Sequence, residues 1–589
     1  MLFKVNFINH SISNPSNGCA VSKSAGTQDE RNEEEGKIKF RISVFYDGTG
    51  NNKLNTVARR MYVKQLSEDE RKELGVVGEI DNNEVDLTEG KTEGQEPELQ
   101  ELQEAFSYLT EDELKKKIKA AKENVEKKID DYIKSSTAVS YLGAETNVYK
   151  MFRDLKKCTV WSPIEKKEDR DWRIFKKFYI EGIGTSAGDD DSDSGGGLAR
   201  GDSGIIKRVR QAKGRVEDFI IKTLIDFESD HKNFNLKRIN IEPIEVDFFG
   251  FSRGAACARY SCKVYKEGDF WVLSLDSINR LDEVVNLRWR PRWRRSPPID
   301  LKEVTIKNVG IFDTVVSHGV WGTMVEGSDK WWLSQDSIKN AAKVYHITAK
   351  DEYRVNFALT NNNSKPERLE LPGAHSDIGG GYNKIESEIM KPILRVDDFA
   401  KAKSIAFWFK KNGWVERVFY ESHGKFALIE SEETFTQPDY WKSLPLDLSE
   451  EDKDYAVLIR GKYLARRWGR HYWGEYEIIL NRSKIYNDYS KISLNHMKKQ
   501  FTSDLVFNED AKDIKIGKTD NGDDSLDLSE LNEVTVFGPK SQETEKTINK
   551  FRLKYMHFSA KAFTIVGAYD IRKSTDEKAA PFIRKEHDG

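Results

Sequence analysis

Apolar runs bounded by polar turns recur over the first two thirds of the chain and alternate with segments of helical periodicity. Strand-like runs occupy residues 38–46, 177–183, 244–251, 304–312 and 342–348. Between two of them, at 214–227, apolar residues recur at helical spacing on one side of an amphipathic segment. Strands that alternate with helices are typical of an α/β fold with a mainly parallel sheet.

The polar positions divide the first part of the chain further. Residues 1–36 are rich in Ser, Asn and Glu and are expected to form a flexible tail. Residues 37–384 carry the α/β core, which a charged insertion at about 58–143 interrupts. Within that insertion, apolar residues at roughly helical spacing predict a helix over 97–134, and its polar faces favour a place on the surface.

The pattern changes after residue 384. Residues 385–507 are rich in aromatic and basic positions, and we expect a helical accessory region there, serving as a lid or as a membrane contact. A polar linker is predicted at 508–545. The amphipathic part of 546–589 predicts a C-terminal helix that returns to the core.

The most informative motif is Gly-Phe-Ser-Arg-Gly at residues 250–254, which follows an apolar strand and leads into a helix of small residues. Gly-x-Ser-x-Gly at a strand-to-helix turn is typical of a nucleophile elbow, which lifts the serine hydroxyl above the sheet. A second match surrounds Ser186, but it leads into an acidic, glycine-rich loop whose charges would oppose an alkoxide. We therefore interpret Ser252 as the nucleophile.

A serine nucleophile needs a base, and the base needs an acid that orients it. Asp313 follows the apolar run 304–312, at the edge where α/β sheets build their sites. His375 lies in a glycine-rich loop and is the favoured base. Asp377 competes as the acid, and His557, beside the C-terminal helix, is the main alternative base.

The oxyanion of such a reaction needs two backbone amides. One is expected from Arg253, the residue after the nucleophile. The other is expected from the turn that ends the first strand, at Gly48 and Thr49, where glycines allow close approach of the backbone. A phosphate-binding loop is not expected, because Gly-x-x-x-x-Gly-Lys-[Ser/Thr] does not occur.

Composition argues against several other classes of protein. The 589 residues contain 33% charged and 38% hydrophobic residues with a net charge of −3, so no nucleic-acid partner is indicated. The four cysteines show no metal spacing, and the chemistry proposed for Ser252 needs neither a metal nor a cofactor. No run approaches the ~20 apolar residues of a membrane span. We expect a soluble chain made in the cytoplasm without a signal peptide.

Six segments together resemble one known family, the α/β-hydrolase domain of unknown function 2235, and they occur in the family's order. They are residues 45–52, 146–148, 182–185, 250–255, 312–315 and 373–382. The best-studied members of this family are the first class of type VI secretion lipase effectors. About 90 residues separate the first two segments, which is longer than the family leads us to expect and agrees with an insertion.

The resemblance implies a phospholipase A that is injected into the periplasm of a neighbouring bacterium. Its partners would be a spike or tube component of the secretion system, a phospholipid membrane surface and a cognate immunity protein. It also implies Ser252, Asp313 and His375 as the catalytic triad. Runs of Arg and Trp at 287–295 and 463–473 would suit anionic headgroups.

Two other functions stay open on the sequence alone. A general carboxylesterase would use the same residues on soluble esters. A non-catalytic interaction protein would keep only the hydrolase scaffold, although such a scaffold has no chemical need for an intact Ser, Asp and His set.

Overall fold

The computed structural model describes residues 36–65, 67, 97–134, 143–158, 171–189, 204–230, 239–266, 304–316, 318–320, 323–325, 338–361, 367–422, 424–433, 448–449, 451–464, 473–508, 527–531, 542–560, 573 and 581–587. Nearly all of the predicted tail and most of the predicted linker lie outside the described residues. The Arg- and Trp-rich run at 287–295 lies outside them too.

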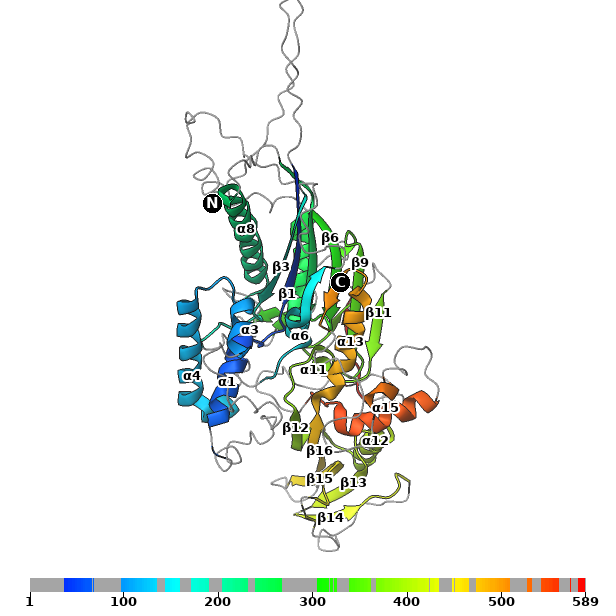
Figure 1. Ribbon diagram of the computed structural model, residues 1–589. Coiled ribbons are helices and arrows are strands. Elements are labelled where there is room, and N and C mark those ends of the chain that lie inside the picture. Colours follow the sequence, from blue (N-terminus) through cyan, green and yellow to red (C-terminus); the bar gives the residue numbers. More distant parts are fainter. Residues whose placement is uncertain are drawn as a thin grey trace, which may run out of the picture.

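A parallel sheet of seven strands forms the centre of the molecule (Figure 1). Its main path is β11-β9-β6-β5-β1-β3, and β4 also pairs with β1. The bounds are Gly36–Tyr46 (β1), Asp171–Ile180 (β3), Ile239–Ile241 (β4), Ile244–Phe251 (β5), Val304–Phe312 (β6), Lys343–Ala349 (β9) and Arg368–Leu371 (β11). Every pairing within it is parallel. The predicted α/β fold with a mainly parallel sheet is confirmed.

The strand order reverses at β1. The chain runs from β1 to β3 on one side, and then returns to β5 on the other side of β1. In open α/β sheets the connections diverge at such a reversal and leave a crevice outside the carboxyl ends of the strands. The ends of β1 and β5 are therefore where a site is expected, and both predicted glycine-rich turns lie there.

Helices cover both faces of the sheet. On one face lie α8 (Ile205–Asp230) and α9 (Arg253–Lys266), and on the other lie α6 (Asn147–Asp154) and α13 (Ser490–Phe501). Because successive side chains of a strand alternate in direction, β1 supplies both apolar cores. Val44 packs in the core beside α8 and α9, and Phe45 packs in the other.

In the described part of the chain, α1 (Lys53–Gln65) leads into the insertion, which contains α3 (Pro97–Ala105) and α4 (Glu111–Lys134). The break between the last two has a local cause. The Thr110 hydroxyl accepts the Glu113 amide at 3.3 Å, and the Glu113 carboxylate accepts the Thr110 amide at 2.8 Å, which is a capping box. Leu102 and Phe106 are buried in the main core. The apolar side of the insertion thus extends that core, whereas charged residues of α4 such as Glu111, Asp112 and Lys115 are exposed, as predicted.

Residues 385–507 contain a second sheet where a helical region was predicted. Its five strands follow the order β12-β16-β15-β13-β14. They are Ile385–Val396 (β12), Arg417–Ser422 (β13), Lys425–Leu428 (β14), Ala456–Leu464 (β15) and Trp473–Tyr486 (β16). The prediction is wrong for these strands, although α12 (Phe399–Lys411) and α13 are helical. The runs 457–459 and 478–480 are wholly buried, and such strands lack the alternation that identifies a half-exposed strand.

Short elements complete the described fold. They are β2 (Leu155–Cys158), β7 (His318–Val320), β8 (Thr323–Val325), β10 (Leu359–Thr360), α11 (His375–Gly379), η7 (Asn487–Tyr489), β17 (Leu505–Phe507), α15 (Gln542–Tyr555) and β18 (Glu586–His587). The last strand pairs in parallel with β10. None of the helices in the described part of the chain has the length and apolar character needed to cross a bilayer.

Candidate active site

The turn after β5 has the geometry of a nucleophile elbow. Ser252 separates β5 from α9 and has a φ of 58°, a left-handed conformation that is uncommon for a residue other than glycine. A Cβ atom at position 250 would lie 2.3 Å from the Gly254 carbonyl oxygen, and one at position 254 would lie 2.3 Å from the Asp47 carbonyl oxygen. Only glycine fits at both positions, because the strand, the helix and the end of β1 approach so closely.

The second Gly-x-Ser-x-Gly match has another local structure. No helix follows Ser186 within the described residues up to 189, and its exposed hydroxyl donates to Asp189 Oδ2 at 3.0 Å. The loop is held by packing against the insertion, since a Cβ at Gly188 would lie 2.7 Å from the Lys117 carbonyl oxygen. Ser186 therefore belongs to a surface turn.

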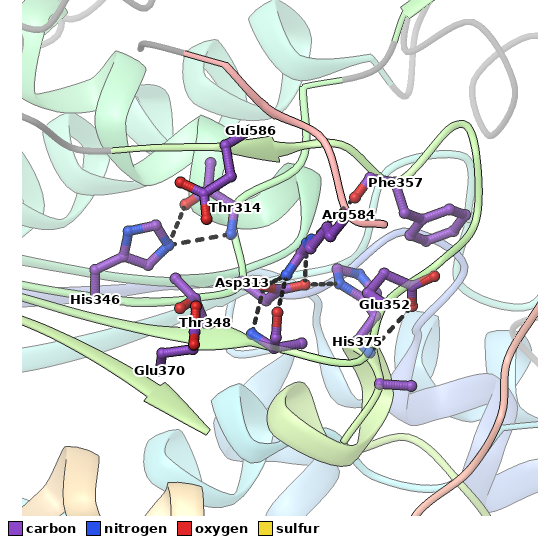
Figure 2. Close-up of polar contacts among 12 residues, drawn as sticks. Asp313, Thr314, His346, Thr348, Glu352, Phe357, Glu370, His375, Arg584 and Glu586 are labelled. Atoms are coloured by element: carbon purple, nitrogen blue, oxygen red, sulfur yellow. Dashed lines mark hydrogen bonds and ion pairs between the residues drawn. The ribbon is translucent and has the colours of Figure 1, made fainter. Parts of the chain in front are cut away.

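The side chains of Asp313 and His375 point toward one another (Figure 2). Asp313 directly follows β6 with a φ of 39°, and the Ser252 amide donates to the carbonyl of Phe312 at 3.1 Å. The two residues therefore leave neighbouring strand ends. His375 begins α11 and places Nδ1 2.6 Å from Asp313 Oδ2. Its ring also packs on that of Phe251, with 4.5 Å between centroids. The structure thus brings the three predicted residues into one place.

Burial and charge set the ionisation of the pair. Burial by itself would raise the pKa of Asp313, but the Arg584 guanidinium and the hydrogen bond from His375 outweigh it and hold that pKa well below its usual value. Burial lowers the pKa of His375, although the hydrogen bond and charge of Asp313 oppose this. A charged carboxylate and a neutral imidazole are the forms that general-base catalysis requires.

Two charged side chains that the sequence analysis missed hold this pair. Arg584 donates to both oxygens of Asp313, at 2.6 and 2.8 Å. Glu352 accepts the backbone amide of His375 at 3.1 Å and forms an ion pair with Arg354 at 2.8 Å. Neither belongs to a recognisable motif, and each lies far from Ser252 in the sequence, so no local signal marked them.

The alternative base, His557, belongs to a second pair. Its Nδ1 lies 2.7 Å from Asp377 Oδ1, and its backbone amide donates to Asp377 Oδ2 at 2.9 Å. Its ring stacks on that of Tyr382, with centroids 3.7 Å apart. Asp377, the alternative acid, is thereby engaged with His557 and not with His375.

The predicted oxyanion loop adjoins the elbow. A Cβ at Gly48 would lie 2.5 Å from the ring of Phe251, so this turn packs directly against the residue before Ser252. The Gly48 amide itself donates to Asp47 Oδ1 at 2.7 Å, which leaves Thr49 as the better candidate of the two. The amide of Arg253, the other predicted donor, lies at the N-terminal end of α9, where the helix dipole favours negative charge.

Asp47 fixes this loop to the rest of the core. Its carboxylate accepts the hydroxyls of Thr146 at 2.6 Å and of Tyr179 at 2.7 Å. Burial raises the pKa of Asp47 to about 6, even though these bonds and the Gly48 amide favour the charged form. The described residues contain no group of three or more His, Cys, Asp or Glu side chains placed to hold a metal ion.

Part of the chain matches a known protein family. Residues 290–405 match the family described as T6SS, phospholipase effector Tle1-like, catalytic domain. No curated protein matches the chain closely enough to count. A structure of the Tle1 effector bound to the VgrG spike from the Type 6 secretion system aligns with 91% of this chain and 89% of its own, at 19% identity and a TM-score of 0.46.

An uncharacterized protein from Pseudomonas aeruginosa aligns with 59% of this chain and 42% of its own, at 13% identity and a TM-score of 0.25. The matched family segment contains Asp313 and His375, whereas Ser252 precedes it. Over residues 290–405, the chain is similar to the catalytic domain of Tle1-like phospholipase effectors of the type VI secretion system.

Proposed function

We propose that this protein is a type VI secretion effector that hydrolyses the acyl ester bonds of membrane phospholipids, with the activity of a phospholipase A. The match to Tle1-like phospholipase effectors supports the substrate class. The arrangement around Ser252 supports a serine hydrolase, in which Asp313 and His375 complete the catalytic set.

One observation carries this proposal. Ser252 has a left-handed backbone between two glycines that no larger residue could replace, and the His375–Asp313 pair adjoins its neighbours: His375 packs on Phe251, and Asp313 follows Phe312, whose carbonyl accepts the Ser252 amide. A strained serine is not needed for a stable strand-to-helix turn, since glycine would fill the position at lower cost. A strained serine beside a buried histidine–aspartate pair is typical of a catalytic nucleophile elbow.

The proposal gives each group a role. Because His375 Nδ1 faces Asp313, its Nε2 is the atom that accepts the proton of Ser252 as the hydroxyl attacks the ester carbonyl. The amides of Arg253 and Thr49 would stabilise the oxyanion. The protonated histidine then gives its proton to the leaving alcohol. Water, activated by the same histidine, releases the fatty acid and restores Ser252.

Delivery follows from the family rather than from the site. We expect a spike or tube component of the secretion system to carry the protein into the periplasm of a target cell, and an immunity protein to protect the producer. In the periplasm the protein would reach a phospholipid membrane surface.

The proposal is tested by fatty-acid release from vesicles of mixed phospholipids. We expect release by the native chain, none above background by Ser252→Ala, and release at the native rate by Ser186→Ala, a matched change in the other Gly-x-Ser-x-Gly turn. Circular dichroism would establish that all three are folded. Release that survives in Ser252→Ala would refute the assignment. Activity on short soluble esters but not on vesicles would instead indicate a general carboxylesterase.

A further inference from the structure

The carboxylate of Asp313 is saturated with hydrogen bonds. Oδ1 accepts the Ala349 amide at 2.8 Å and Arg584 Nη1 at 2.6 Å, whereas Oδ2 accepts Arg584 Nη2 at 2.8 Å and faces His375 Nδ1 at 2.6 Å. A carboxylate offers about four lone-pair positions, so these four donors leave it no alternative partner. Two of the four come from one guanidinium, whose planar fork matches a carboxylate.

Arg584 lies on the segment 581–587, and this segment is held at the edge of the site. Its strand β18 pairs with β10, and the ring of Phe582 lies among those of Trp408 and Phe558, with centroids 5.2 and 5.8 Å away. Figure 2 shows the side chain reaching from this segment to Asp313. It is 7% exposed.

The guanidinium is fixed by further contacts. It also donates to the backbone carbonyls of Ala349 at 2.5 Å and of Phe357 at 3.2 Å. Phe357 in turn packs edge-on against His375, with centroids 5.1 Å apart. Arg584 therefore contacts the acid and a neighbour of the base.

We propose that Arg584 is a positioning residue for the hydrolysis proposed above, on which this inference rests: its bidentate ion pair keeps Asp313 charged and oriented so that Asp313 can align His375. A charge buried without a partner is expensive, and a carboxylate held by the imidazole and one amide alone would be free to rotate or to take up a proton. The 581–587 segment thus completes the catalytic site.

The ion pair also sets how readily the histidine pair takes up a proton. Asp313 and a neutral His375 together carry one negative charge, and Arg584 brings the total to zero. Removing Arg584 must therefore make protonation of the pair easier, whichever of the two groups holds the proton. Among the described residues, the other charged or titratable groups near the pair include Arg259, His346, Glu352, Arg354, Arg368 and Glu586. All of them are kept in the variants of Arg584.

The test compares Arg584→Ala and Arg584→Lys with the native chain in the vesicle assay over a range of pH. For Arg584→Ala we expect kcat to fall about 10- to 100-fold, the loss of hydrogen bonds to a charged group, with little change in KM. The acidic limb of the pH profile should move to higher pH. Arg584→Lys keeps the charge but not the fork, so we expect an intermediate kcat. Added guanidinium should partly restore Arg584→Ala.

Glu586→Gln is the matched control. Glu586 lies on the same segment and pairs with Arg368 at 2.7 Å on the surface, and it acts on Asp313 only through its charge at longer range. If the segment acts only as a structural support, both kinds of variant should lower the melting temperature and leave the acidic limb in place. If Arg584 acts through Asp313, its own variants should move that limb to higher pH. Glu586→Gln, which removes a negative charge, should leave the limb in place or move it slightly to lower pH.

The outcomes separate the two proposals. Ester release that does not depend on Ser252 would refute the proposed function itself. Release that depends on Ser252, combined with native kcat and an unmoved acidic limb in Arg584→Ala, would overturn only the role of Arg584. If Arg584→Ala does not fold, kcat and the pH profile are measured for Arg584→Lys instead. A native kcat and an unmoved acidic limb in that variant would overturn the role of Arg584.

Discussion

Two buried histidine–aspartate pairs lie on either side of one short helix, and they have nearly the same local geometry. His375 Nδ1 lies 2.6 Å from Asp313, and His557 Nδ1 lies 2.7 Å from Asp377. Both histidines are almost fully buried. The helix α11 supplies the histidine of the first pair and the aspartate of the second.

The surroundings of the two pairs differ. The first lies at the carboxyl edge of the parallel sheet, against Phe251, the residue before the strained Ser252. The second joins α11 to the segment after α15, and its imidazole stacks on Tyr382. The comparison teaches that a histidine–aspartate hydrogen bond does not by itself identify a catalytic base. What distinguishes the first pair is its place beside the strained turn at Ser252.

The largest effect should come from removing the first imidazole. We expect His375→Ala to lower kcat on the order of 10⁴-fold, because no other group would accept the Ser252 proton. The measurement is fatty-acid release at saturating vesicle concentration. His557→Gln is the comparison variant, and it should retain most of kcat once its folded fraction is taken into account. If His557→Gln lost kcat and His375→Ala retained it, His557 would be the base.

A change in the second pair should act on stability instead. Asp377→Asn replaces a carboxylate that accepts the Ala374 amide at 2.8 Å as well as the His557 amide. We expect the free energy of unfolding to fall by about 1.5–3 kcal/mol, as for other hydrogen bonds to charged groups. Denaturant titration measures it. A loss of kcat as large as that of His375→Ala, with unchanged stability, would contradict this division of roles.

The pH profile of the native chain should report the first pair. Because burial holds the pKa of His375 below its ordinary value, its neutral form persists to lower pH than that of an exposed histidine. Below that pKa the base is protonated, and kcat/KM should fall about tenfold per pH unit. We therefore expect activity to persist at pH values where an exposed histidine is mostly protonated. An acidic limb above about 6.5, the ordinary pKa of histidine, would count against a buried base.

The smallest effect should come from the ring that covers the second pair. Tyr382→Leu removes the stacking on His557, and we expect unfolding to become easier by about 0.5–1.5 kcal/mol with kcat nearly unchanged. The midpoint of denaturant unfolding measures this. A marked drop in kcat would show that the second pair communicates with the active site through α11.

Much of the central fold could be predicted from periodicity. The run 304–312 is the strand β6 with the same bounds, and 38–46 and 342–348 differ from β1 and β9 by at most two residues at either end. The second sheet could not be predicted in this way. The runs 457–459 and 478–480 in its β15 and β16 are wholly buried, and an apolar run without alternation fits a buried helix as well as a buried strand.

By itself, the sequence determined the parallel core and the elbow at Ser252, because both depend on neighbours along the chain: strand alternation, and two glycines flanking one serine. Only the tertiary structure decided which histidine meets which aspartate, and that Arg584 holds the acid. Those contacts join residues 62, 180 and 271 positions apart, and no local preference of the chain specifies partners at such separations. They follow from the order of the strands, which places distant segments at one edge of the sheet.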